Sequence, residues 1–130
     1  MPLMRIDMPK GRERAEIRKI MDIGYEVAKD TLKIPEGDRY QIVTLHDENE
    51  MIFEDTGLGF KRSKNIICFS LTSRPRTKQQ KLDFYKLLVD RLHNELNIEP
   101  CDIMINFIIN GDDDWSFAFG KAQFITGELK

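Results

Sequence analysis

The chain has 130 residues, a length that fits one domain with one hydrophobic core. Hydrophobic residues make up 41% and charged residues 32%, which excludes the disordered and fibrous classes. The net charge of −2 leaves no basic footprint for nucleic acid, and no apolar run approaches the roughly 18 residues of a membrane span. We therefore expect a single domain over residues 1–130, with neither nucleic acid nor a membrane as partner.

The N-terminal half reads as a strand, a helix and a second strand. Residues 2–8 form a short apolar segment, and apolar residues between 17 and 32 recur at helical spacing. Residues 39–45 are rich in β-branched side chains, which favours a strand. The first segment, MPLMRIDMPKGRER, lacks the apolar stretch of a signal peptide, so we expect a cytoplasmic protein.

The C-terminal half repeats this order. It has a strand at 66–72, an apolar helix face from 85 to 96 and an apolar strand at 102–109. Thr77 and Gln80 form a capping-box pattern, which predicts that the second helix begins near residue 77. Two further segments, Met51–Phe53 and Trp115–Phe119, are expected to add short strands.

The two halves also resemble each other in sequence, as pseudo-repeats over about 2–60 and 66–120. At an offset of 64 residues, the identical pairs are Leu32/Leu96, Ile34/Ile98 and Asp38/Asp102. The identities are few, so a chance match is the alternative. Two strands joined by a helical crossover run parallel. A duplicated β-α-β unit therefore predicts an α+β fold, a four-stranded mixed sheet with two helices on one face.

The other face of this sheet would carry no helix. Residues 66–69 are apolar at every position, and residues 103–109 nearly so, which predicts apolar side chains on both faces of these strands. An uncovered apolar sheet face needs a partner, and another copy of the chain is the simplest one. We therefore expect a homo-oligomer.

Proline follows the initiator methionine, and Met1 is normally removed from a Met-Pro sequence. Removal would expose the secondary amine of Pro2 at the start of a strand. An α-amino group titrates near about 8 and attacks carbonyls, so Pro2 could act as base, acid or nucleophile. The alternative is that Pro2 merely occupies the first position of a strand, which tolerates proline.

A pair of arginines, Arg74 and Arg76, precedes the second helix. The residue before a proline is extended, and side chains two apart in an extended segment point the same way. The two guanidinium groups would then lie together at a helix N-terminus, where a carboxylate or phosphate could bind. An exposed basic loop is the alternative.

Asp38 precedes the second strand and could activate water or hold an ammonium group. Its repeat mate Asp102 occupies the same position, which leaves a turn-forming role as the alternative. Trp115, Phe117 and Phe124 would place aromatic rings together, either as core packing or as the wall of a pocket. The two cysteines have no zinc-site spacing, and we expect neither a metal nor another cofactor.

Together these motifs resemble the tautomerase superfamily (the fold of macrophage migration inhibitory factor), and within it the malonate semialdehyde decarboxylase group. The resemblance runs from Pro2 to about Leu129. It rests on PLMRID at the start, GDRYQ from Gly37, EDTGLGF from Glu54, the arginine pair and DWSF from Asp114.

The resemblance implies a carboxy-lyase that decarboxylates malonate semialdehyde or a similar short 3-oxo acid. By resemblance, Pro2 is the catalytic proline, Asp38 works with it, and the arginine pair binds and polarises a small carboxylate substrate. The wall of the pocket is expected to comprise Trp115, Phe117, Phe124 and Leu129. The family implies a homotrimer whose sheets form a central barrel. A promiscuous enol/keto tautomerase of the same superfamily and a non-catalytic trimeric binding protein remain the alternatives.

Overall fold

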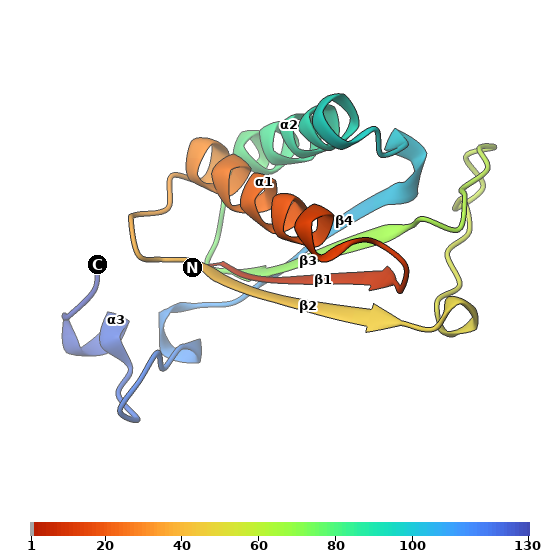
Figure 1. Ribbon diagram of the computed structural model, residues 1–130. Helices are drawn as coiled ribbons and strands as arrows, with labels where there is room; N and C mark the ends of the chain where they lie inside the picture. The colour runs from red at the N-terminus through yellow and green to blue at the C-terminus, as the bar shows by residue number, and fades with distance from the viewer. Residues whose placement is uncertain (1) are drawn as a thin grey trace.

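The computed structural model describes residues 2–130, in which two long helices pack on one face of a four-stranded sheet (Figure 1). The first unit contains β1 (Leu3–Pro9), α1 (Arg14–Leu32) and β2 (Tyr40–His46), and the second contains β3 (Ile67–Ser73), α2 (Lys78–Leu96) and β4 (Ile103–Ile109). The connections carry η1 (Glu48–Glu50), η2 (Pro100–Asp102), η3 (Asp112–Asp114) and α3 (Gln123–Thr126). Within the described residues, no helix is both long and apolar enough to cross a membrane.

The strand order is β2-β1-β3-β4, and the predicted α+β fold is confirmed. β1 runs parallel to β2, and β3 runs parallel to β4, as the crossover helices require. The two units meet through the antiparallel pair β1/β3, so the sheet is mixed. β3 and α2 repeat β1 and α1 at the offset of 64 residues, whereas β4 repeats β2 at an offset of 63.

Because of this one-residue difference in offset, Asp38 and Asp102 do not occupy equivalent positions in the two units. Asp102 directly precedes β4, whereas Asp38 lies two residues before β2. Asp102 is buried, and its carboxylate accepts hydrogen bonds from the backbone N–H and the hydroxyl of Ser63 at 2.7 and 2.6 Å. Asp102 therefore anchors the segment before β3, and its structural role does not transfer to Asp38.

The prediction of two further strands is wrong. Residues 51–53 and 115–117 are irregular, and Ala118 forms only an isolated bridge with Lys121. The aromatic side chains of the second segment pack against one another instead of extending the sheet, as described below.

The core lies between the sheet and the helices. Alternate residues of the central strands face the helices and are fully or almost fully buried, among them Ile6, Met8, Phe69 and Leu71. They meet the apolar faces of α1 and α2, on which Ile20, Val27, Phe84, Leu88 and Leu92 are buried. A Cβ at Gly24 of α1 would lie 2.9 Å from Sδ of Met4, so glycine there allows α1 to approach β1 closely.

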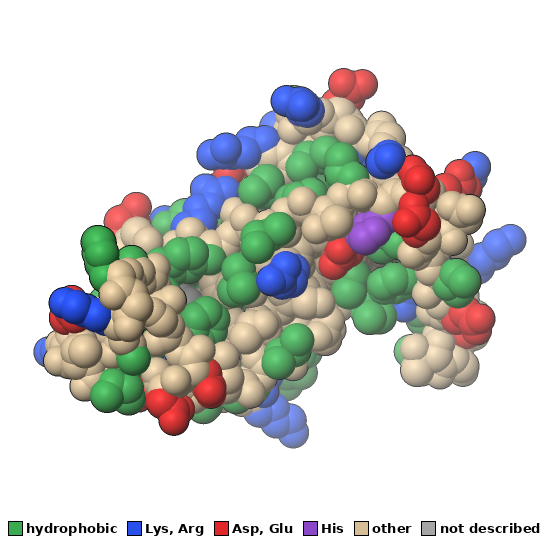
Figure 2. Space-filling view, turned by 90° about the horizontal axis from the view of Figure 1, so that it is seen from below, with side chains coloured by type: hydrophobic (Ala, Val, Ile, Leu, Met, Phe, Trp, Pro, Cys, Tyr) green, Lys and Arg blue, Asp and Glu red, His purple; other side chains and the backbone are tan. Residues whose placement is uncertain are grey.

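The opposite sheet face carries no helix and is more polar than the sequence predicted. Figure 2 shows basic, acidic and histidine side chains among the apolar ones on this face. Strand alternation places Arg5, Asp7 and Ser70 there on the two central strands, and His46 Nε2 lies 2.7 Å from Asp7 Oδ1. The exposed apolar side chains of this face belong to the two edge strands and are Tyr40, Ile42, Met104 and Ile108. In the segment 66–69, Ile67 and Phe69 point into the core, whereas Cys68 lies on the opposite face, where it is buried beside Ser70.

Candidate active site

The sheet topology brings the predicted site residues to one end of the sheet. Leu3 at the start of β1 lies opposite Tyr40 of β2 on one side and Thr72 of β3 on the other. Ser73 at the end of β3 lies opposite Ile109 at the end of β4. The starts of β1 and β2 therefore meet the ends of β3 and β4. Residues just before β1 and β2 share this edge with those just after β3 and β4.

A pocket of about 440 Å³ lies at this edge. Asp38, Arg74 and Arg76 line it together with an apolar group made of Phe117, Phe124 and Leu129. Pro2 is buried and lines a smaller adjoining recess, which shares Ile34, Asp38 and Tyr40 with the pocket. The volume is in the range of small-molecule sites. Sequence reasoning did not single out Tyr40, although its position two residues after Asp38 in an extended segment places both side chains on one side.

The predicted removal of Met1 concerns a residue outside the described range 2–130. The structure shows the place that a free Pro2 amine would occupy, at the head of β1 beside the pocket. Processing of the N-terminus stays a prediction.

Arg76 is held by the body of the domain. Its Nη1 donates to the carbonyl of Leu32 at 2.6 Å, at the C-terminal end of α1, and its Nε donates to the buried hydroxyl of Ser73 at 2.9 Å. A cation at this end of a helix complements the helix dipole. Burial and then the like charge of Arg74 lower the pKa of Arg76, while Asp38 acts in the opposite direction. The charges of Arg74 and Asp38 therefore both act on Arg76.

Arg74 is held from the other side, by the segment that follows β4. Its guanidinium lies 4.0 Å from the ring centre of Phe124, and its Nη1 donates to the main-chain oxygen of Lys130 at 3.1 Å. Its Nε forms an ion pair of 2.7 Å with Asp112. The two arginines, which are two residues apart, are thus held by different parts of the chain.

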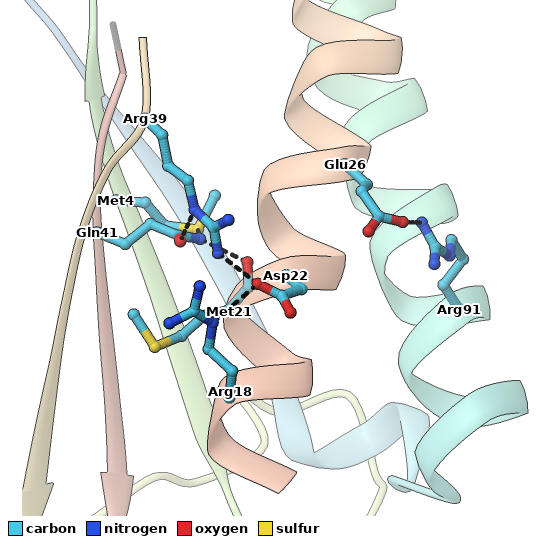
Figure 3. A network of polar contacts seen from close by, with 8 residues as sticks. All are labelled: Met4, Arg18, Met21, Asp22, Glu26, Arg39, Gln41 and Arg91. Carbon is cyan, nitrogen blue, oxygen red and sulfur yellow. Dashed lines mark hydrogen bonds and ion pairs between the residues drawn. The ribbon is translucent and has the colours of Figure 1, made fainter. Parts of the chain in front are cut away.

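The side chain of Arg39 fixes the segment that carries Asp38. The side chain of Arg39 extends toward α1, where its Nη2 donates to Asp22 at 2.6 Å (Figure 3). Its Nε donates to Gln41 of β2 at 2.7 Å. Gln41 in turn donates to the carbonyl of Met21 at 2.7 Å. Because successive side chains of an extended segment alternate, Asp38 points away from Arg39 and toward the pocket. No sequence motif identified this anchoring role.

The aromatic residues form a stack that links the C-terminal segment to β2. Phe117 stacks on Tyr40 with ring centres 5.8 Å apart and meets Phe124 edge-on at 5.5 Å. Trp115 is not in contact with the pocket. It stacks behind Phe117 at 5.5 Å, and its indole N–H donates to Asn110 at 2.8 Å. The expected wall therefore comprises Phe117, Phe124 and Leu129, with Trp115 as its support.

This arrangement suits a small organic anion. Two guanidinium groups can bind a carboxylate, Asp38 can hold a neighbouring ammonium group, and the aromatic wall excludes water from one side. Within the described part of the chain, no group of three or more His, Cys, Asp or Glu is placed to hold a metal ion.

Comparisons with known proteins point to one family. The family described as "Tautomerase enzyme" matches residues 38–118. "Probable tautomerase YrdN" of Bacillus subtilis (strain 168) is 45% identical over 129 residues, which cover 99% of this chain and 100% of the relative. A crystal structure of malonate semialdehyde decarboxylase is 41% identical, with a TM-score of 0.94, and covers 98% of this chain and 99% of its own. A symmetric trimer of fused 4-OT shares the fold at 10% identity, with a TM-score of 0.73 and coverage of 89% and 93%.

Proposed function

This chain belongs to the tautomerase family, and we propose that within this family it decarboxylates malonate semialdehyde or a similar short 3-oxo acid. The observation that carries the proposal is the pocket itself, in which Asp38, the arginine pair and an apolar wall adjoin the recess of Pro2. The likeness to malonate semialdehyde decarboxylase over nearly the whole of both chains supports the same reaction.

The reaction requires a group that accepts negative charge on the carbonyl oxygen. When the bond to the carboxylate breaks, its electron pair forms a C=C bond, the carbonyl π electrons move to oxygen, and carbon dioxide leaves. With Met1 removed, the nearby carboxylate of Asp38 favours a protonated Pro2, which donates a hydrogen bond to the developing enolate oxygen. The enolate carbon then takes up a proton from water to give the aldehyde. A neutral Pro2 could instead form an iminium that accepts the same electron pair.

The arginine pair has the complementary task of holding the carboxylate. A bound guanidinium can turn the carboxylate so that the breaking bond lies parallel to the carbonyl π orbitals. Phe117, Phe124 and Leu129 cover the other side of the pocket. A dry surface beside the reacting atoms strengthens the interaction between the ammonium group and the enolate.

Enol/keto tautomerisation is the second candidate, because the relative of 45% identity carries the name of a probable tautomerase. That reaction needs a neutral Pro2 as a base, whereas decarboxylation through the ammonium group needs a protonated one. The pH dependence of the two rates therefore separates tautomerisation from decarboxylation through the ammonium group. Decarboxylation falls as the proline loses its proton, and tautomerisation rises.

A panel of 3-oxo acids and enol acids, followed by NMR with the processed protein, tests the proposal. We expect a 3-oxo acid to be converted to the aldehyde with release of carbon dioxide. A matched protein with one alanine before Pro2 should keep its thermal stability and lose turnover. Turnover of enol acids alone would favour the second candidate, and an extended protein with the normal rate would remove Pro2 from the mechanism.

We also propose that the protein is a homotrimer. Exposed apolar side chains on both edge strands, Ile42 and Ile108 among them, support contacts with other copies. Phe119 and Ile125 after β4 are 93% and 62% exposed, which adds a further apolar surface. Light scattering should give three times the chain mass of 15.2 kDa. A stable monomer at micromolar concentration would contradict this assembly.

A further inference from the structure

Asp112 lies outside the pocket, yet its carboxylate contacts one of the two pocket arginines. Its Oδ1 is 2.7 Å from Nε of Arg74, and the two side chains are 51% and 31% exposed. Because Nη1 of Arg74 donates to the main-chain oxygen of Lys130, two of the three guanidinium nitrogens face protein oxygens. Within residues 2–130, no protein acceptor contacts the third nitrogen, Nη2, which leaves it available to a ligand.

The turn that carries Asp112 is firmly attached to the sheet. The backbone N–H of Asn110 donates to the carbonyl of Ser73 at 2.8 Å, one residue before Arg74. Gly111 N–H donates to Asp114 at 2.8 Å, and the indole of Trp115 donates to Asn110. These bonds fix the position of the Asp112 carboxylate relative to the end of β3. The ion pair therefore sets the direction of the Arg74 guanidinium as well as its charge environment.

The charges around the pocket then form two opposed pairs. Arg74 is paired with Asp112, and the charge of Arg76 is opposed by that of Asp38. Each pocket arginine therefore already has a protein carboxylate acting on it, which weakens its attraction for a further carboxylate of a ligand. Lys33, Glu36 and Lys130 at the rim are exposed and largely screened by solvent. The negative charge of Asp112 therefore disfavours a second carboxylate of a ligand near Arg74.

We propose that Asp112 is a positioning residue for Arg74 and that it makes the pocket selective for substrates with a single carboxylate. The inference deepens the proposed function, on which it rests for the class of ligand, because malonate semialdehyde carries one carboxylate. Loss of the Asp112 charge frees the Arg74 guanidinium and leaves one unbalanced cation. A second carboxylate of the ligand then gains a partner, and preference moves toward dicarboxylates.

Two unreactive three-carbon acids test the inference. 3-Hydroxypropanoate has one carboxylate and malonate has two, and calorimetry at low ionic strength gives the ratio of their Kd values for the full chain. For a separation of about 6 Å between the Asp112 carboxylate and the ligand, loss of this unit charge in Asp112→Asn should change the ratio by about three- to thirty-fold toward malonate. Asp113→Asn is the matched control, because it removes the same charge from the adjacent exposed residue. Asp112→Glu should keep the wild-type ratio, because it retains the carboxylate.

Three results would overturn the inference. The first is a wild-type protein that binds neither acid or shows no preference for the monocarboxylate. The second is a shift in Asp113→Asn as large as that in Asp112→Asn, since this indicates a general charge effect. The third is an Asp112→Asn shift that persists in an Arg74→Gln background, where no guanidinium remains to position. Because binding needs no turnover, the shift in the Kd ratio can occur even in a protein that decarboxylates no 3-oxo acid. Failure of the Asp112 inference can therefore be told apart from failure of the proposed decarboxylation.

Discussion

The two pocket arginines should differ in their effect on stability, although we propose the same substrate-binding role for both. Replacing Arg76 by alanine removes hydrogen bonds to Leu32 and Ser73, which tie the end of β3 to the end of α1. Hydrogen bonds to charged groups contribute about 1.5–3 kcal/mol each. The loss is partly offset, because burial and Arg74 both disfavour the charged guanidinium of Arg76, as its lowered pKa indicates. We expect a net destabilisation of about 1–3 kcal/mol.

Replacing Arg74 by alanine should cost much less stability. Its partners are the exposed carboxylate of Asp112, the main-chain oxygen of Lys130 and the ring of Phe124. Exposed ion pairs contribute about 0.2–1 kcal/mol, and exposed cation–π contacts a similar amount. Because solvent screens both interactions, we expect a destabilisation of about 1 kcal/mol or less.

Urea unfolding at one fixed protein concentration measures the difference, with decarboxylation rates measured on the same samples. Both variants should lose on the order of 30- to 1,000-fold in rate, because each removes a charged contact that we propose for the substrate. Arg76→Ala alone should also show a clear fall in the free energy of unfolding. Equal destabilisation by the two variants, or an Arg76→Ala protein as stable as wild type, would refute the structural distinction.

Three further changes test separate parts of the site. Asp38→Asn should lower the pKa of the Pro2 amine, since an opposite charge is lost, and should slow decarboxylation while sparing tautomerisation. NMR titration of the proline nitrogen checks this, and an unchanged pKa would contradict it. Arg39 holds the pKa of Asp22 below its ordinary 3.8, so this ion pair stabilises the fold above that pH and less as pH falls. Urea unfolding of wild type and Asp22→Asn should therefore differ near neutral pH and converge toward about pH 3. Burial raises the pKa of the Cys68 thiol, so a thiol reagent followed by mass spectrometry should modify it only after unfolding.

The sequence by itself determined the order of the elements and the fold class. The helical spacing of apolar residues and the β-branched segments are local properties, and the capping box of Thr77 and Gln80 forms as predicted. The repeat of these elements fixed the parallel pairing within each unit, because crossover handedness and connection length leave few alternatives. The resemblance to the tautomerase superfamily came from the same printed residues, and the comparisons confirmed it.

Only the tertiary structure decided which members of a local pattern face the pocket. The repeat paired Asp38 with Asp102, but a one-residue change in offset buries Asp102 and leaves Asp38 at the pocket. The aromatic pattern could not place Trp115 behind Phe117, because that choice depends on the hydrogen bond to Asn110. The contact between Arg74 and Asp112 joins residues 38 positions apart through the pairing of β3 with β4. Local sequence determines local conformation, whereas a binding site depends on long-range contacts that form only when the sheet is assembled.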